Sequence, residues 1–111
     1  MEDLVKDYEQ DVLVGKALQM MYAIHSTSVD ELGKPYFLKV ISFFSMIASK
    51  TTNKDIWIIS LISEFDKNEL YSLEDLSIFG EEIKVAVSEL KNSETKNEMV
   101  ITFNGVKNEL E

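Results

Sequence analysis

His25 is the only histidine of the chain, and the sequence contains no cysteine. One histidine cannot build a multi-histidine metal centre, and without cysteine there is neither a thiolate zinc site nor a thiol nucleophile. Serines and carboxylates are plentiful, but no spacing selects a Ser-His-Asp triad. A phosphate-binding glycine loop, a helical two-histidine zinc motif and a calcium-loop pattern are also missing from the sequence. Generic motifs therefore indicate no catalytic chemistry, and His25 by itself is typical of a structural or surface histidine on the polar edge of a helix.

The elements that position His25 are predicted to be helices. Apolar residues at three- and four-residue spacing predict one or two helices over residues 3–25, where Gly15 marks either a break or the close approach of another helix. A loop over residues 26–33 follows, and Pro35 suits the first turn of a second helix over about 35–49. This second helix is apolar on most sides, which is typical of a central buried helix.

Polar capping residues mark the starts of the later helices. A Ser, Thr or Asn side chain accepts a hydrogen bond from the free N–H groups at a helix start, and a capping box adds an acidic residue three positions on. We therefore predict a third helix, a short helix, a helix over about 79–91 and a last helix. The predicted caps are Thr52 or Asn53, the Ser72–Asp75 box and the Thr95–Glu98 box. Five or six helices in 111 residues predict an all-α, compact orthogonal helical domain that occupies residues 1–111 as one domain.

The order and spacing of four segments between residues 17 and 87 are similar to those of the motifs of a known protein family. They are Ala17-Leu18 with Tyr22-Ala23-Ile24-His25, then Gly33-Lys34-Pro35-Tyr36, then Ser60-Leu61-Ile62-Ser63-Glu64-Phe65-Asp66-Lys67-Asn68, and finally Leu73-Glu74-Asp75-Leu76 with Phe79-Gly80-Glu81-Glu82-Ile83 up to Val87. In this order they resemble the HD-domain metal phosphohydrolases, and most closely the hydrolases of the stringent-response alarmone (p)ppGpp. The resemblance implies an HD-domain-like helical fold in which His25 matches the first metal-binding histidine.

The other positions that the resemblance assigns to metal and water chemistry have lost the required groups. The second histidine is replaced by Lys39, and an ammonium group has no lone pair to give a metal. The His-Asp pair is replaced by Ser63 and Glu64, and the acidic pair that orients water by Lys67 and Asn68. The expected vestigial pocket consists of His25, Lys39, Ser63, Glu64, Lys67 and Asn68. We therefore expect a pseudo-enzyme with no catalytic residue, no bound metal and no cofactor.

Two further expectations concern charge around this pocket. Asp30 and Glu31 stand where relatives usually carry an Arg-Lys pair near the nucleotide, so the charge of this candidate ligand loop is inverted. A buried carboxylate without a partner is costly, and we therefore expect Lys39 and Glu64 to form an ion pair near His25 in place of the metal. The alternative is that both side chains simply reach solvent at the rim of the pocket.

The net charge of −9 opposes binding to nucleic acid or to an anionic membrane surface. It suits a soluble domain, or an acidic surface that meets a basic partner. The chain begins Met1-Glu2-Asp3 without a signal-peptide pattern, and its apolar stretches are shorter than the ~20 residues of a membrane span. With no cysteine, the composition favours a cytoplasmic protein.

Three functions remain open from the sequence. The first is a catalytically inactive regulatory or protein-interaction module with an unidentified protein partner. The alternative is a metal-independent nucleotide-binding, sequestering protein, in which His25, Lys39 and Lys67 serve one phosphate. The third is an enzyme with a shifted metal site formed by His25, Glu64 and Asp66. The large apolar content of the helices also leaves a homodimer open.

Overall fold

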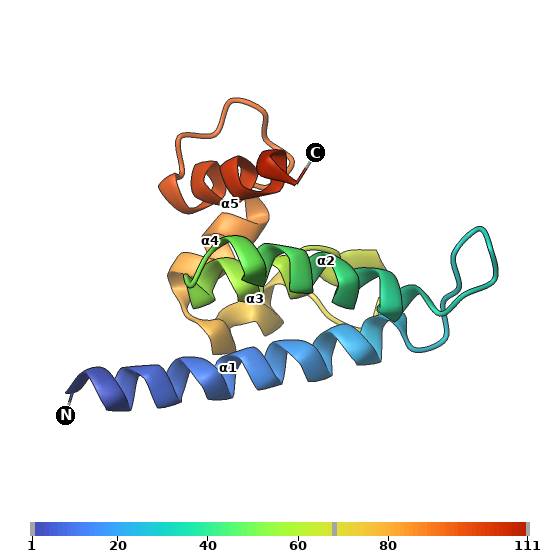
Figure 1. The fold of residues 1–111 in the computed structure, drawn as a ribbon, viewed down its shortest axis with the longest axis horizontal. Coiled ribbons are helices and arrows are strands. Elements are labelled where there is room, and N and C mark those ends of the chain that lie inside the picture. The colour runs from blue at the N-terminus through green and yellow to red at the C-terminus, as the bar shows by residue number, and fades with distance from the viewer. Residues whose placement is uncertain (1, 68, 111) are drawn as a thin grey trace.

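The first three helices of the chain pack against one another (Figure 1). The computed structural model describes residues 2–67 and 69–110, with side chains from Tyr8 onward. Its first elements are α1 (Glu2–His25), α2 (Tyr36–Lys50) and α3 (Lys54–Ile62). α1 and α2 run side by side in opposite directions, and α3 contacts both of them. The connection between α1 and α2 is a hairpin in which Val29 pairs with Pro35.

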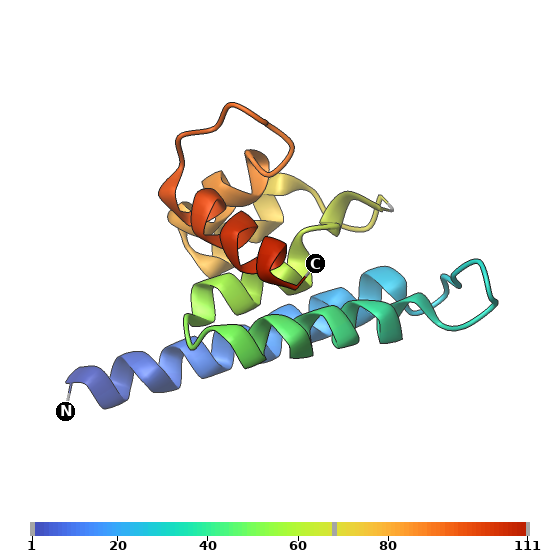
Figure 2. The ribbon, with the colours of Figure 1, turned by 45° about the horizontal axis from the view of Figure 1, so that its top comes forward.

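The remaining elements cover the other side of α3 (Figure 2). They are the 3-10 helices η1 (Phe65–Lys67) and η2 (Leu73–Phe79), followed by α4 (Glu81–Ser88) and α5 (Glu98–Glu109). The all-α class is confirmed, because the described residues form helices and no strand longer than the single bridge in the hairpin. The radius of gyration of 13.9 Å is that of a compact chain of this length. Within the described ranges, no helix has both the length and the apolar character needed to cross a bilayer.

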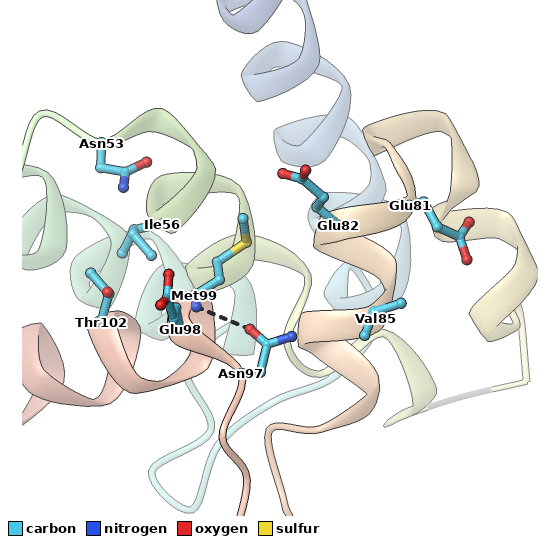
Figure 3. Close-up of a pocket in the computed structure, with 9 residues that line it drawn as sticks. All are labelled: Asn53, Ile56, Glu81, Glu82, Val85, Asn97, Glu98, Met99 and Thr102. Atoms are coloured by element: carbon cyan, nitrogen blue, oxygen red, sulfur yellow. Dashed lines mark hydrogen bonds between the residues drawn. The ribbon is translucent and has the colours of Figure 1, made fainter.

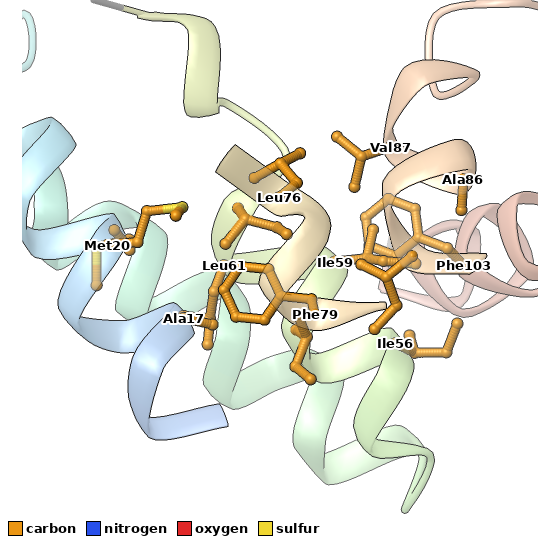
Figure 4. Packing of buried hydrophobic residues seen from close by; sticks show 14 of the residues in the cluster. Ala17, Met20, Ile56, Ile59, Leu61, Leu76, Phe79, Ala86, Val87 and Phe103 are labelled. Atoms are coloured by element: carbon orange, nitrogen blue, oxygen red, sulfur yellow. The ribbon is translucent and has the colours of Figure 1, made fainter. Parts of the chain in front are cut away.

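The central helix is α3, and the prediction that the second helix is the buried one is wrong. α2 buries only Val40 and Ile47, while Leu38, Ile41 and Met46 are exposed. Six of the nine residues of α3 are buried: Ile56, Ile58, Ile59, Ser60, Leu61 and Ile62. Figure 4 shows the packing of its side chains with residues of the other helices, among them Ala17, Met20, Leu76, Phe79, Val87 and Phe103. α3 has neighbours on several sides, whereas α2 keeps one face toward solvent.

Two of the predicted caps are confirmed. The side chain of Asn53 accepts a hydrogen bond from the N–H of Asp55 at 3.0 Å, which caps α3. At the start of η2, the Asp75 carboxylate accepts a hydrogen bond from the N–H of Ser72 at 2.7 Å, which is the carboxylate half of a capping box. The short helix that was predicted here is therefore present, as a 3-10 helix.

The predicted Thr95–Glu98 box is wrong. α5 begins after Asn97, whose side-chain oxygen accepts hydrogen bonds from the N–H groups of Met99 at 3.0 Å and Val100 at 3.2 Å. The Thr95 hydroxyl instead accepts from the N–H of Asn97 at 3.1 Å and donates to Glu89. A competing asparagine two residues later thus takes the capping position.

Two glycines bear on the predicted helix boundaries, and the structure selects one helix, not two, for the first segment. α1 continues through Gly15 as one helix, and a Cβ added at Gly15 would meet no atom within 4 Å. Neither a break nor a close helix approach within this chain explains that glycine. Gly80 has a φ of 101°, a backbone conformation that residues other than glycine rarely adopt. It separates η2 from α4, so the helix predicted over 79–91 is confined to Glu81–Ser88.

Candidate functional site

A cavity of about 390 Å³ is lined by residues of α1, α2, α3 and α5 and of the segments that follow α3 and α4. It contains four of the residues predicted for the vestigial pocket: His25, Lys39, Ser63 and Glu64. Its apolar wall consists of Val40, Phe43, Leu61, Leu90 and Phe103, and its other polar residues are Tyr36, Ser60, Lys91, Asn104 and Lys107. The fold therefore brings together most of the residues that the sequence motifs select. We call this cavity the His25 cavity.

His25 is the last residue of α1 and is only 1% exposed, so it is buried and does not lie at the surface. Its Nδ1 is buried and has no hydrogen-bond partner among the described groups. The imidazole ring lies 4.9 Å from the ring of Tyr36. Burial lowers the pKa of His25, and this effect outweighs the opposing influence of Glu64. His25 is therefore a neutral, buried group with one unused hydrogen-bonding nitrogen.

Glu64 is held by two partners that the sequence did not assign to it. The Tyr36 hydroxyl donates to the carboxylate, at 3.0 Å from Oε1 and 2.8 Å from Oε2. The Lys67 ammonium lies 3.3 Å from the Glu64 carboxylate and 4.1 Å from the centre of the Tyr36 ring. Tyr36 raises the pKa of Lys67 most strongly, with a further contribution from Glu64.

The expected ion pair between Lys39 and Glu64 is wrong. Among the described residues, the salt-bridge partner of Glu64 is Lys67, which lies three residues later and in η1. The N–H of Lys67 donates to the carbonyl of Glu64 at 3.0 Å, so the local turn already holds the two side chains close together. The Lys39 ammonium instead lies 5.8 Å from the centre of the Tyr36 ring.

The residues at the expected metal positions do not fit a divalent metal ion. Lys39 offers no lone pair, Ser63 offers only a neutral hydroxyl, and the Glu64 carboxylate already has two hydrogen-bonding partners. Across residues 2–67 and 69–110, no group of three or more His, Asp or Glu side chains is arranged to hold a metal. The alternative site of His25, Glu64 and Asp66 is not among the described groups that could hold a metal, and the Asp66 carboxylate lies 3.7 Å from the Lys91 ammonium.

Three of the predicted residues do not line the cavity, and a fourth has no described position. Lys67 contacts Glu64 but does not line the cavity, and Asn68 lies outside the described residues. Asp30 and Glu31 lie in the hairpin and do not line the cavity either.

Asp30 has a structural role in the hairpin turn. Its carboxylate accepts hydrogen bonds from the N–H groups of Leu32 at 2.8 Å and Lys34 at 3.0 Å. The bond from Lys34 is the main cause of the lowered pKa of Asp30. This turn therefore explains an aspartate at position 30 without any ligand.

Sequence reasoning missed the polar residues that come from the rest of the cavity wall. Tyr36 stands inside the motif that was recognised, but only the structure shows its hydroxyl directed to Glu64. Lys91 follows α4, and Lys107 lies on α5, far from His25 in the sequence. Lys39 and Lys107 form no salt bridge with a described carboxylate. No local pattern could have placed these lysines at one cavity.

A second cavity, of about 590 Å³, lies where the starts of three helices meet (Figure 3). Its carboxylates are those of Glu81 and Glu82 on α4 and Glu98 on α5, and Ile56 and Met99 add apolar surface. Acidic residues in the first turn of a helix interact favourably with the helix dipole. The acidic character of this cavity is thus accounted for by the helix starts.

Comparison of the chain with protein-family models, curated proteins and solved structures finds no match. The resemblance to the HD-domain hydrolases therefore depends on the sequence motifs alone.

Proposed function

We propose that this chain is a catalytically inactive regulatory module that binds a small anionic ligand in the His25 cavity without a metal ion. The observation that carries the proposal is the convergence of Lys39, Lys91 and Lys107 on one cavity of a chain with a net charge of −9. Among the described residues that line the cavity, the single carboxylate is that of Glu64, which is already paired with Lys67. Lys91 lies 3.7 Å from the Asp66 carboxylate, so Lys39 and Lys107 are the cavity lysines without a salt bridge among the described residues. These two lysines make the local charge positive, although the chain as a whole is strongly acidic.

The other groups of the cavity complement an anion that has a carbon framework. The unused Nδ1 of His25 supplies a hydrogen-bonding group in a place that water reaches poorly. The apolar wall, with Phe43 and Phe103, suits the carbon part of a ligand. The cavity volume of about 390 Å³ lies near the lower end of the usual range for ligand sites, ~300–1,000 Å³. A small phosphate ester, such as a nucleoside monophosphate, suits this volume better than an extended polyphosphate does.

Calorimetric titration in the presence of a chelator tests the proposal. The probes are inorganic phosphate, a nucleoside monophosphate and the uncharged nucleoside. We expect the two anions to bind and the uncharged nucleoside to bind more weakly. The double variant Lys39→Gln/Lys107→Gln should lose at least about tenfold in affinity, which corresponds to ~1.4 kcal/mol.

The matched control is Lys16→Gln/Lys96→Gln, which removes the same number of positive charges at positions that do not line the cavity. It should retain the affinity of the wild type. Equal affinity of both double variants, or no binding of either anion, would refute the ligand site.

A protein-interaction role is favoured by a different observation. Leu38 and Met46 of α2 are about half exposed, at 48% and 47%, and Ile41 is exposed beside them. Large apolar side chains on one exposed helix face are typical of an interaction surface. Replacing Leu38 and Met46 by Glu should abolish capture of a protein partner and leave anion affinity unchanged, which separates the two roles.

A further inference from the structure

The outer face of α1 carries a second regular pattern, separate from the one that faces the core. Tyr8, Val12, Gly15, Gln19 and Tyr22 recur at alternating spacings of four and three residues, as in the seam of a coiled coil. Tyr8 is 70%, Val12 40% and Tyr22 55% exposed. The core-facing side of the same helix carries Ala17, Met20, Met21 and Ile24 instead. We call these five residues the α1 seam; all are uncharged, four are exposed and Gly15 is partly exposed.

Gly15 lies at the middle of the α1 seam. A glycine inside a helix costs roughly 0.5–1 kcal/mol relative to alanine. Apart from the adjoining backbone of α1 and the two neighbouring residues, no described atom lies within 4 Å of a Cβ added there, so no packing contact among the described residues requires the glycine. Such a position lets the backbone of another helix approach closely from outside.

The α1 seam is nearly symmetric about Gly15. Tyr8 lies seven residues before Gly15 and Tyr22 seven residues after it, while Val12 and Gln19 lie three before and four after. If a second α1 crosses antiparallel at Gly15, Tyr8 of each copy lies opposite Tyr22 of the other. A surface that matches itself in this way is what a twofold dimer requires.

Charge favours the same antiparallel arrangement. Residues 2–11 contain five acidic residues and one lysine, whereas residues 12–25 contain no acidic residue and one lysine. The neighbouring α2 also has no acidic residue and carries Lys39 and Lys50. Antiparallel pairing places the acidic half of each α1 against the half of its partner that lacks acids, whereas parallel pairing would place the two acidic halves together.

We propose that the occupant of the α1 seam is a second copy of this chain, bound antiparallel with the two Gly15 residues at the crossing point. Tyr22 contacts Phe37 with ring centres 5.2 Å apart, so the seam continues onto the exposed apolar side of α2. This inference depends on α1 and not on the His25 cavity, so failure of ligand binding would not contradict the dimer, and a monomeric protein would not contradict ligand binding.

Sedimentation velocity tests the oligomeric state. The wild type should sediment as a dimer, and Val12→Glu/Tyr22→Glu should sediment as a monomer with unchanged helical circular dichroism. The control is Ile101→Glu, which places one acid at a 54% exposed apolar position on α5 and should leave the dimer intact. A monomeric wild type, or a Val12→Glu/Tyr22→Glu variant that dimerises as strongly as the wild type, would overturn the proposal.

Disulfide trapping tests the orientation without relying on destabilising variants, because the chain has no cysteine of its own. An oxidised mixture of Tyr8→Cys and Tyr22→Cys chains should form the mixed disulfide dimer, and neither variant alone should cross-link efficiently. Efficient cross-linking of each variant with itself, without the mixed product, would indicate a parallel pair and contradict the inference.

Discussion

Replacement of Tyr36 by Phe isolates the contact that anchors Glu64 beside the cavity. The Tyr36 hydroxyl lies 3.0 and 2.8 Å from the two carboxylate oxygens, and Phe removes it while retaining the ring between His25 and Lys67. A hydrogen bond to a charged group contributes about 1.5–3 kcal/mol to the free energy of unfolding. The Glu64 side chain is 43% exposed and keeps Lys67 as a partner, so water and the ammonium compensate part of the loss. We therefore expect Tyr36→Phe to lower the free energy of unfolding by about 1 kcal/mol, or Tm by ~4 °C.

Urea denaturation followed by circular dichroism measures this difference. Tyr71→Phe is the matched control, since the Tyr71 hydroxyl has no hydrogen-bond partner among the described residues, and the change should leave stability within about 0.3 kcal/mol of the wild type. A double-mutant cycle with Glu64→Gln should give a coupling energy of about 1 kcal/mol between the two side chains. A Tyr36→Phe protein as stable as the wild type, with no coupling to Glu64, would refute the assigned role of this hydroxyl.

Three further predictions concern the core, the glycines and pH. Ile59 is fully buried in α3, so Ile59→Ala should lower the free energy of unfolding by about 2–5 kcal/mol in chemical denaturation; a loss below about 1 kcal/mol would contradict the central place of α3. Gly105 lies inside α5 with open space around an added Cβ, so Gly105→Ala should raise the free energy of unfolding by about 0.5–1 kcal/mol and raise Tm with it. Gly80 has a φ of 101°, so Gly80→Ala should lower Tm. A change of the same sign in both variants would contradict these backbone conformations. Burial lowers the pKa of His25, so as pH falls the unfolded chain takes up a proton near pH 6.5, before the folded chain does. The free energy of unfolding should therefore fall as pH decreases below about 6.5. His25→Gln should flatten this pH dependence in denaturation curves, and an unchanged slope in the variant would contradict the prediction.

The helical elements could be predicted from the sequence because their signals are local. Apolar spacing along α1 and the caps at Asn53 and Ser72 depend on contacts between residues only a few positions apart. The last helix was predicted correctly as α5, but its predicted cap was wrong because two capping candidates, Thr95 and Asn97, lie close together and the sequence does not rank them. Boundaries near Gly80 also changed, since its positive φ is visible only in the folded backbone.

Burial could not be predicted from composition. α2 is more apolar than a surface helix usually is, and it nevertheless leaves Leu38, Ile41 and Met46 exposed. α3 is short and lies among the other helices, so its six buried residues are determined by its neighbours. An apolar pattern shows that a helix has a face to bury, but the number of elements packed around it decides how many faces are covered.

In the candidate site, too, some features could be predicted from the sequence and others could not. The resemblance to the HD-domain hydrolases implied that His25, Lys39, Ser63 and Glu64 gather in one place, and all four line the His25 cavity. The partner of Glu64 was predicted wrongly because a distant lysine was preferred over Lys67, which lies three residues along the chain.

The sequence by itself determined the all-α class and most helix starts, because residue type and short-range spacing are sufficient for both. Only the tertiary structure decided that α3 is central, that Tyr36 holds Glu64, and that Lys91 and Lys107 join Lys39 at one cavity. These features depend on contacts between residues far apart in the chain, where side-chain packing and the direction of each helix decide which groups meet. Gly15 is a further example: the sequence marked it as unusual, but only the fold shows that it lies on a face of α1 that the described residues leave uncovered.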